Sequence, residues 1–238
     1  MAPQPMSDLT FVLLPGAGGD PWYWHRVVPE LQAGGHLVIP VALPAADDDA
    51  GLPDYADAVI QAMGPQAQRR VVLVAQSMAG FTAPLVCERV PIHTLVLVNA
   101  MIPRPGESPG EWFGNTRQDE AKREQNTRDG RERDAPFDVL QDFFHDVPQP
   151  VIDAAWARGE PRQSQRLFGS RCTFKGWPAA STHVLVGRED RFFPAPFQQR
   201  IAQERLGAAI QLMPGGHLLA LSQPQELARR LLACAGAA

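Results

Sequence analysis

A single serine stands where an apolar run gives way to small residues. The run is Val71 to Ala75, and Ser77 follows it in the sequence VVLVAQSMAG. Small residues two positions before and after the serine, here Ala75 and Ala79, allow a sharp turn from strand to helix, because larger side chains would collide there. Such a turn exposes the serine hydroxyl, and the N-terminus of the following helix favours developing negative charge. Ser77 is therefore a candidate nucleophile, and the alternative interpretation is a serine that caps a helix.

A serine nucleophile needs a base, and the base needs a carboxylate that orients it. His217 in GGHLLAL follows the last apolar run of the chain, and Asp190 in LVGREDRFFP follows the run before it. One helix and one strand fit between them, so both residues can lie at the same edge of a sheet. The alternative interpretation makes Asp190 a turn or capping residue and His217 the start of a helix. Glu189 is the rival acid, and we expect it to be solvated.

A glycine-rich loop, LLPGAGGDPWYW (13–24), follows the first apolar run. Such a loop can direct backbone N–H groups at an anion, here the carbonyl oxygen of a substrate. The expected donors of this oxyanion hole are the N–H groups of Ala17 and Met78. A phosphate-binding loop is excluded, because the chain has neither GxxxxGK[ST] nor GxGxxG at this place.

The candidate residues follow short apolar runs that alternate with amphipathic stretches. The runs that we predict to be strands are 11–15, 36–43, 71–75, 93–99, 182–187 and 209–214. The stretches that we predict to be helices are 21–34, 53–63, 78–89, 195–206 and 217–233. Runs that are apolar throughout are typical of parallel strands covered on both faces. The alternation predicts the α/β class, with a doubly wound, mainly parallel six-stranded sheet.

Residues 103–180 break this alternation. They contain no convincing parallel-type strand, and they include a mixed-charge run at 116–134. We predict that this run is a solvated helix face or a mobile loop. Because the insertion follows the fourth strand, where open α/β sheets present ligand sites, we interpret 103–180 as a helical cap, or lid. Residues 1–102 and 181–238 then form the core.

The composition excludes several classes of protein. Among 238 residues, 22 are Lys or Arg and 26 are Asp or Glu, which gives a formal charge of −4. A mildly acidic chain has no general attraction to nucleic acid or to an anionic membrane, so neither is an expected partner. The chain shows no signal-peptide pattern and no apolar run of membrane-spanning length. The three cysteines match neither a disulfide framework nor zinc spacing, so we expect a reduced, cytoplasmic protein without a metal site. No sequence feature sets the oligomeric state, and a homodimer is compatible with the sequence.

Four segments resemble the α/β-hydrolase superfamily, and most closely its branch of plant methyl esterases and hydroxynitrile lyases. PGAGGDPWYW is similar to the branch's HGAxxxxWxW, GHLVIPVALPA to GHxVxAxDLxA, EDRFFPAPFQQR to EDxxxPxxFQ, and GGHLLALSQPQELARRLL to GxDHxxxLxxPxxL. The resemblance covers residues 9–102 and 182–233 and is weak across the cap. It implies the α/β-hydrolase fold and no metal or organic cofactor. The site residues that it implies are Ser77, Asp190 and His217 for the triad, with Ala17 and Met78 for the oxyanion hole.

Departures from the branch's pattern bear on the reaction. The lyases carry a Thr where this chain has Gly16, and a Lys after the catalytic His where this chain has Leu218. A lyase needs that cation to stabilise the departing cyanide, so the resemblance implies hydrolysis of a small carboxylic ester, or of a lactone or thioester. Pro15 replaces the His that usually precedes the oxyanion-loop glycine, which leaves the backbone donors of the loop in place.

Other functions on the same fold stay open. One is a ligand-sensing receptor with little turnover, and another is a cofactor-free lyase or oxygenase. The presence of a serine, an acid and a histidine candidate favours an enzyme over a receptor. A purely structural protein would leave their joint placement unexplained.

Several residues of the cap and of the loops are candidate walls of a substrate pocket. They are Trp22, Met101, Trp112, Phe143, Phe144 and His145. Each also fits ordinary packing, as aromatic residues in a lid commonly do. Together they would suit a small-molecule ester with an apolar acyl or aromatic group.

Overall fold

Six parallel strands form one sheet in the computed structural model, which describes residues 9–236. The strands are β1 (Leu9–Leu14), β2 (Leu37–Pro40), β3 (Arg70–Gln76), β4 (Thr94–Val98), β5 (Ser181–Gly187) and β6 (Ile210–Met213). Their order across the sheet is β2-β1-β3-β4-β5-β6, and every neighbouring pair is parallel. The predicted fold class is therefore confirmed. β2 ends at Pro40 and is therefore shorter than the predicted 36–43.

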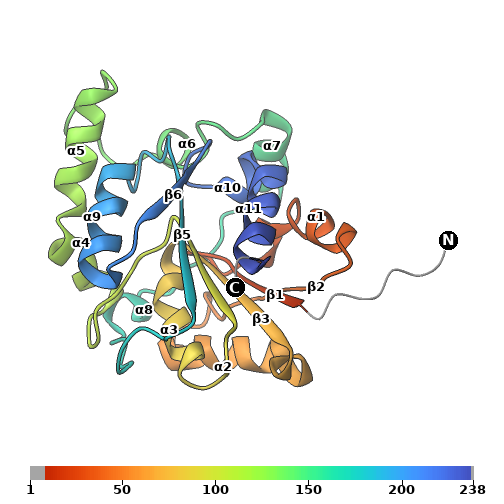
Figure 1. The fold of residues 1–238 in the computed structure, drawn as a ribbon. Helices are drawn as coiled ribbons and strands as arrows, with labels where there is room; N and C mark the ends of the chain where they lie inside the picture. Colours follow the sequence, from red (N-terminus) through yellow and green to blue (C-terminus); the bar gives the residue numbers. More distant parts are fainter. Residues whose placement is uncertain (1–8, 237–238) are drawn as a thin grey trace.

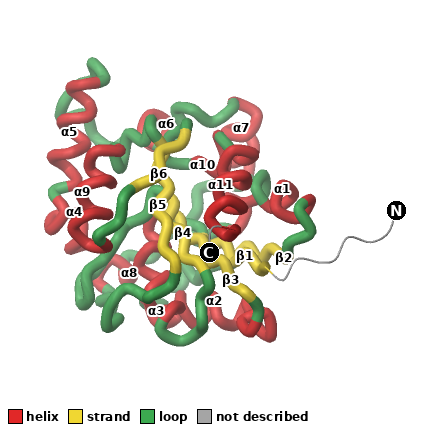
Figure 2. Tube along the Cα trace, viewed as in Figure 1, coloured by secondary structure: helices red, strands yellow, loops and turns green. Residues whose placement is uncertain are grey.

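Helices cover both faces of this sheet (Figures 1 and 2). The helices of one layer are α1 (Val28–Ala33) and α11 (Pro224–Gly236), and those of the other are α2 (Leu52–Met63), α3 (Thr82–Cys87) and α9 (Ala195–Leu206). Successive side chains of a strand point to opposite faces. Phe11 and Leu13 of β1 accordingly pack in the cluster that includes α1 and α11, whereas Val12 and Leu14 pack with α2, α3 and α9. This two-sided burial explains why the strands are apolar throughout.

Two of the predicted helices that the structure divides have a proline near the start of their second part. The range 21–34 forms a 3-10 turn at Pro21–Trp24 and then α1, which has a proline in its first turn. The range 217–233 forms α10 (Leu219–Ser222) and then α11 from Pro224. Proline lacks an N–H group and disfavours helical geometry in the residue before it, so it starts a new helix instead of continuing the old one.

The segment between β4 and β5 contains helices and no strand from residue 103 to residue 180. Its helices are α4 (Pro109–Thr116), α5 (Gln118–Arg128), α6 (Val139–Asp142), α7 (Gln149–Ala157) and α8 (Arg166–Gly169). Figure 1 shows α5, in green, beside α4 and α9 at one side of the molecule. α5 holds much of the mixed-charge run and buries Gln118, Lys122 and Asn126, which recur every fourth residue along one face. Across residues 9–236, no helix combines the length and apolar character needed to cross a bilayer.

Candidate active site

Ser77 occupies a sharp corner at the carboxyl end of β3. Its φ is +52°, a left-handed conformation that is rare for residues other than glycine. The 3-10 turn Ser77–Phe81 follows directly and leads into α3. A Cβ atom on Gly80 would lie 1.8 Å from the carbonyl oxygen of Met101, so this position of the corner needs glycine. The strained backbone is typical of a functional site held in place by its surroundings.

His217 joins Ser77 to Asp190 through two hydrogen bonds. Its Nε2 lies 3.1 Å from Ser77 Oγ, and its Nδ1 lies 2.8 Å from Asp190 Oδ2. All three residues are buried. An ionised carboxylate only accepts, so Nδ1 carries the proton, and Nε2 of the neutral ring is left to accept from the serine hydroxyl. Ser77 is thereby placed for activation by a base.

Two backbone donors fix the carboxylate of Asp190. Its Oδ1 accepts from the N–H groups of Phe192, at 2.9 Å, and Phe193, at 2.8 Å, while Oδ2 faces the imidazole. Glu189 beside it is exposed, as expected, and its Oε2 accepts from Gly215 N at 2.6 Å. Asp190, and not Glu189, is therefore the carboxylate that contacts the histidine.

Asn99 is a residue that the sequence analysis missed. It follows β4, has a φ of +43° and is fully buried. Its Nδ2 donates to the carbonyl oxygens of Gly216, at 2.9 Å, and His217, at 3.1 Å, and its Oδ1 accepts from Gly187 N at 2.8 Å. The amide thus ties the end of β5 to the loop that carries the histidine. The only sequence signal was a polar residue at the end of the run HTLVLVN.

The segment between β4 and β5 also contacts the loop that carries His217. We call this loop, residues 214–218, the histidine loop. Asp146 Oδ2 accepts from Gly216 N at 2.6 Å. Next to it, the Nε2 of His145 lies 3.1 Å from the carbonyl oxygen of Glu189. Burial lowers the pKa of His145 from its usual 6.5, and the positive charge of Arg191 acts in the same direction. His145 therefore contacts the loop that carries Asp190 as an uncharged side chain at neutral pH.

The glycine-rich loop lies against Ser77. A Cβ atom on Gly16 would lie 2.9 Å from the Cβ atom of Ser77, and the N–H of Gly16 donates to Gln76 Oε1 at 3.0 Å. Gln76 Nε2 also points to the carbonyl oxygen of His217, at 3.4 Å. Gln76, which the sequence analysis did not select, therefore connects the glycine-rich loop to the loop that carries His217.

The predicted oxyanion donors sit on the two segments that meet here. Ala17 is exposed, and Met78 is the second residue of the 3-10 turn that begins at Ser77. Within residues 9–236, hydrogen bonds are recorded for the N–H groups of Gly16, Gly18 and Gly19, and none for that of Ala17. The N–H of Ala17 is thus available to an incoming oxygen.

A narrow gap lies between these two segments, and it is too small to admit a water molecule. Residues that line it include Gly16, Leu43, Tyr55, Met78, Thr82 and Leu167. Most of the residues that line it are apolar, and Tyr55 and Thr82 are the exceptions. The six residues predicted from the sequence as pocket walls are not among those that line it.

Those six residues have varied surroundings. Phe143 stacks on the His217 ring, with centroids 4.5 Å apart. Phe144 packs against Trp156, and Trp22 stacks on His25. Met101 and Trp112 are buried in the core, where the indole of Trp112 donates to the carbonyl oxygen of Ile102. Of the six, Phe143 is the residue whose ring stacks on His217. A role of the six in substrate binding stays a prediction.

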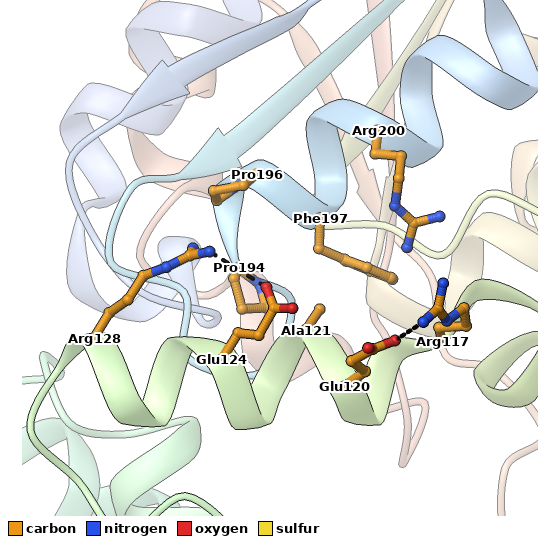
Figure 3. Close-up of a pocket in the computed structure, with 9 residues that line it drawn as sticks. All are labelled: Arg117, Glu120, Ala121, Glu124, Arg128, Pro194, Pro196, Phe197 and Arg200. Carbon is orange, nitrogen blue, oxygen red and sulfur yellow. Dashed lines mark hydrogen bonds and ion pairs between the residues drawn. The ribbon is translucent and has the colours of Figure 1, made fainter.

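A larger groove of about 390 Å³ lies elsewhere, between α5 and α9 (Figure 3). It is lined by charged residues such as Arg117, Glu120, Glu124, Arg128 and Arg200, and by Phe197. Two of these arginines are paired with glutamates of α5, Arg128 with Glu124 and Arg117 with Glu120. Ser77, Asp190 and His217 do not line this groove, so its size does not make it the active site. Among residues 9–236, no cluster of His, Cys, Asp and Glu is arranged to hold a metal ion.

The chain is similar to known proteins in sequence and in fold. Norfluorocurarine synthase 1 of Strychnos nux-vomica is 23% identical over 91% of each chain, and methylesterase 3 of Arabidopsis thaliana is 30% identical over 93% of this chain and 94% of its own. Among solved structures, a pyrethroid hydrolase from Sphingobium faniae superimposes with a TM-score of 0.72 at 19% identity, covering 96% of this chain and 98% of the other. Residues 11–230 match the family described as the alpha/beta hydrolase family, and we conclude that this chain is a member of that family.

Proposed function

We propose that the chain is a serine hydrolase that cleaves a small carboxylic ester through an acyl-enzyme. The observation that carries the proposal is the series of hydrogen bonds from Asp190 through His217 to Ser77. Family membership supports it, as does the name of the methylesterase relative. A lactone or thioester would react by the same steps.

In the first half of the reaction, Ser77 Oγ attacks the acyl carbon and its proton passes to Nε2 of His217. Asp190 keeps the proton on Nδ1 and stabilises the imidazolium that forms. The negative charge that develops on the carbonyl oxygen is met by the N–H groups of Ala17 and Met78. His217 then gives its proton to the departing alcohol, which leaves the acyl group on Ser77.

In the second half, water replaces the alcohol. His217 takes a proton from the water, whose oxygen attacks the acyl carbon, and the proton returns to Ser77 Oγ as the ester bond to the serine breaks. The products are the carboxylic acid and the free enzyme. These steps use only side chains and backbone groups of this chain.

The test is hydrolysis of p-nitrophenyl acetate by the wild type, Ser77→Ala and Ser181→Ala. Ser181 is a matched control, because its hydroxyl contacts His183 at the amino end of β5. Ser77→Ala should lower kcat by about 10³- to 10⁶-fold, and Ser181→Ala should leave it close to that of the wild type. Equal turnover by the wild type and Ser77→Ala would refute the mechanism. Tight ligand binding without turnover by any variant would instead indicate a receptor.

A further inference from the structure

One stretch of the segment between β4 and β5 packs on the glycine-rich loop. We call this stretch, residues 158–167, the strap. A Cβ atom on Gly18 would lie 2.6 Å from the Cβ atom of Pro161, so the strap touches the loop directly. Beside this contact, Ser164 N donates to the carbonyl oxygen of Ala45 at 2.7 Å. The strap is therefore held against the loop that carries one of the proposed oxyanion donors.

The glycine-rich loop makes a tight turn from Gly16 to Gly19. Gly19 N donates to the carbonyl oxygen of Gly16 at 3.1 Å, and Gly18, the third residue of the turn, has a φ of +85°. A positive φ at this place is typical of a type II turn, whereas a type I turn has a φ of about −90° there. The two turns differ in the orientation of the peptide group between their second and third residues, here Ala17 and Gly18. Glycine adopts both conformations readily, so the turn by itself does not fix this peptide group.

Gln163 of the strap contacts the same peptide group. Its Oε1 accepts from Gly18 N at 3.0 Å, and its Nε2 lies 3.1 Å from the hydroxyl oxygen of Tyr55 on α2. A backbone N–H only donates, so the amide oxygen of Gln163, and not its nitrogen, faces Gly18. The N–H and C=O of a trans peptide point in opposite directions. A flip would therefore turn the carbonyl oxygen of Ala17 toward Gln163 Oε1, where two acceptors would meet, and the contact favours the orientation that is present.

The other N–H groups of the turn are occupied as well. Gly16 N donates to Gln76 Oε1 and Gly19 N to the carbonyl oxygen of Gly16, whereas within the described part of the chain Ala17 N makes no hydrogen bond. Because the carbonyl oxygen of Gly16 faces Gly19 N, the N–H of Ala17, on the opposite side of the same peptide, points out of the turn. Ala17 thus lies between two peptide groups that are held by glutamine side chains, Gln76 on β3 and Gln163 on the strap.

We propose that Gln163 is a positioning residue of the oxyanion hole, which is complete only when the strap lies on the glycine-rich loop. The inference rests on the proposed ester hydrolysis at Ser77. Gln163 acts through Gly18, because its oxygen holds the peptide group that follows Ala17. Without this acceptor the turn can change between its two forms. The change alters the ψ of Ala17 and so displaces the N–H that meets the developing oxyanion.

The test measures hydrolysis of p-nitrophenyl acetate by the wild type, Gln163→Leu and Gln163→Glu. Leucine is similar in size but has no acceptor, so kcat should fall about ten- to a hundredfold, with a smaller change in KM, because the contact acts on the transition state. Glutamate keeps an oxygen for Gly18 N and should recover most of the loss. Gln149→Leu is the matched control, because the amide of Gln149 donates to Asp153 on the exposed surface of α7, and its kcat should equal that of the wild type.

A second measurement, inhibition by trifluoroacetone, reports on stabilisation of the oxyanion. Ser77 Oγ adds to the carbonyl carbon of the ketone, its proton passes to His217 Nε2, and the electron pair of the C=O bond moves to the ketone oxygen, which becomes an alkoxide. The oxyanion donors bind this alkoxide as they bind that of an ester. The Ki of Gln163→Leu should therefore rise by about the factor by which its kcat falls.

Two results would overturn the proposal. One is a lower kcat of Gln163→Leu with the Ki of the wild type, and the other is wild-type values of both in the folded variant. If Gln163→Leu does not fold, Gln163→Asn takes its place, because an amide on a side chain shorter by one CH2 group does not reach Gly18. The same two results in Gln163→Asn would overturn the proposal.

Failure of the proposed hydrolysis gives a different result. If the wild type does not cleave the ester, fluorine NMR measures the trifluoroacetone adduct on the wild type, Ser77→Ala and Gln163→Leu. An adduct that requires Ser77 and is weaker in Gln163→Leu would support the role of Gln163 without turnover. An adduct of equal stability in the wild type and Gln163→Leu would overturn that role. A wild type that forms no adduct would overturn it together with the proposed function, because the chain would then have no working oxyanion hole.

Discussion

The ring of Phe143 lies flat on the imidazole of His217, with centroids 4.5 Å apart and planes inclined by 14°. Phe192 and Phe193 meet the same imidazole edge-on, at 5.6 Å and 5.2 Å. The proposed base is thus enclosed by three aromatic rings, of which Phe143 comes from the segment between β4 and β5. This contact limits rotation of the imidazole away from Ser77 and keeps water from one of its faces.

An ion pair holds Phe143 in this position. Asp142, directly before it, is buried, and its Oδ2 lies 2.8 Å from Lys122 Nζ and accepts from Asp138 N at 3.0 Å. Removing one partner of a buried pair leaves a charge without compensation, which costs more than the pair itself contributes. The position of Phe143 therefore depends on α5 as well as on its own packing.

Phe143→Ala should lower kcat by about ten- to a hundredfold, because a displacement of about 1 Å in a reacting group has an effect of that size. Phe144→Ala is the matched control, since Phe144 packs against Trp156 and not against the histidine. Steady-state kinetics on a p-nitrophenyl ester and thermal unfolding of both variants check the prediction. Equal losses of kcat in the two variants would show that stacking on His217 has no special effect.

Asn99→Ala should destabilise the protein by about 3 kcal/mol or more, because buried backbone groups that lose a partner cost about 1–3 kcal/mol each. The groups affected are Gly187 N and the carbonyl oxygens of Gly216 and His217. The histidine loop would also lose its tie to β5, so kcat should fall. Asn126→Ala removes another buried amide, which binds the carbonyl oxygen of Arg133, and should lower stability without lowering kcat. Urea unfolding and kinetics on both proteins test this difference, and unchanged kcat in folded Asn99→Ala would contradict it.

Gln76→Met keeps much of the side-chain volume but loses the contacts with Gly16 N and the carbonyl oxygen of His217. The oxyanion loop and the histidine loop would then be positioned independently. We expect kcat to fall about tenfold or more, with a smaller change in KM, because positioning errors act on the transition state. Gln76→Glu retains an acceptor for Gly16 N and should recover part of the loss. A change confined to KM would assign Gln76 to substrate binding instead.

The parts of the fold that could be predicted from the sequence are those with a strong local signal. The run Val71–Ala75 and the small residues around Ser77 specify a buried strand and a tight corner without reference to the rest of the chain. Asp190 and His217 could be selected because each follows a strand, and parallel strands bring their carboxyl ends to one edge. The parallel topology therefore allowed three residues that were selected separately to be predicted as one site.

The residues that escaped prediction act across long distances in the sequence. Asn99 and Gln76 bind groups more than a hundred residues away, and Gln163 reaches Gly18 and Tyr55 from the segment between β4 and β5. Amide side chains carry no periodic pattern, and their partners are mostly backbone groups, which are present at every position. Only the folded chain shows which of them meet.

The stability of the protein should depend on pH through His145. Its pKa in the folded protein lies below the usual 6.5, chiefly through burial, with the charge of Arg191 adding to the effect. As the pH falls below 6.5, the unfolded chain takes up a proton before the folded one does, so stability decreases until the pH reaches the folded pKa. Well above pH 6.5 both states are neutral at this residue, and its contribution to stability does not change with pH.

As the pH falls from about 7 to about 5, the Tm of His145→Gln should therefore decrease less than that of the wild type. Glutamine is chosen because its amide can still donate to the carbonyl oxygen of Glu189. His183→Gln is the matched control, because burial also lowers the pKa of His183, on β5. Both variants should flatten the pH dependence of Tm, but only His145→Gln should also change kcat, since His145 contacts the residue next to Asp190. A Tm profile for His145→Gln that runs parallel to that of the wild type would mean that protonation of His145 is not linked to unfolding.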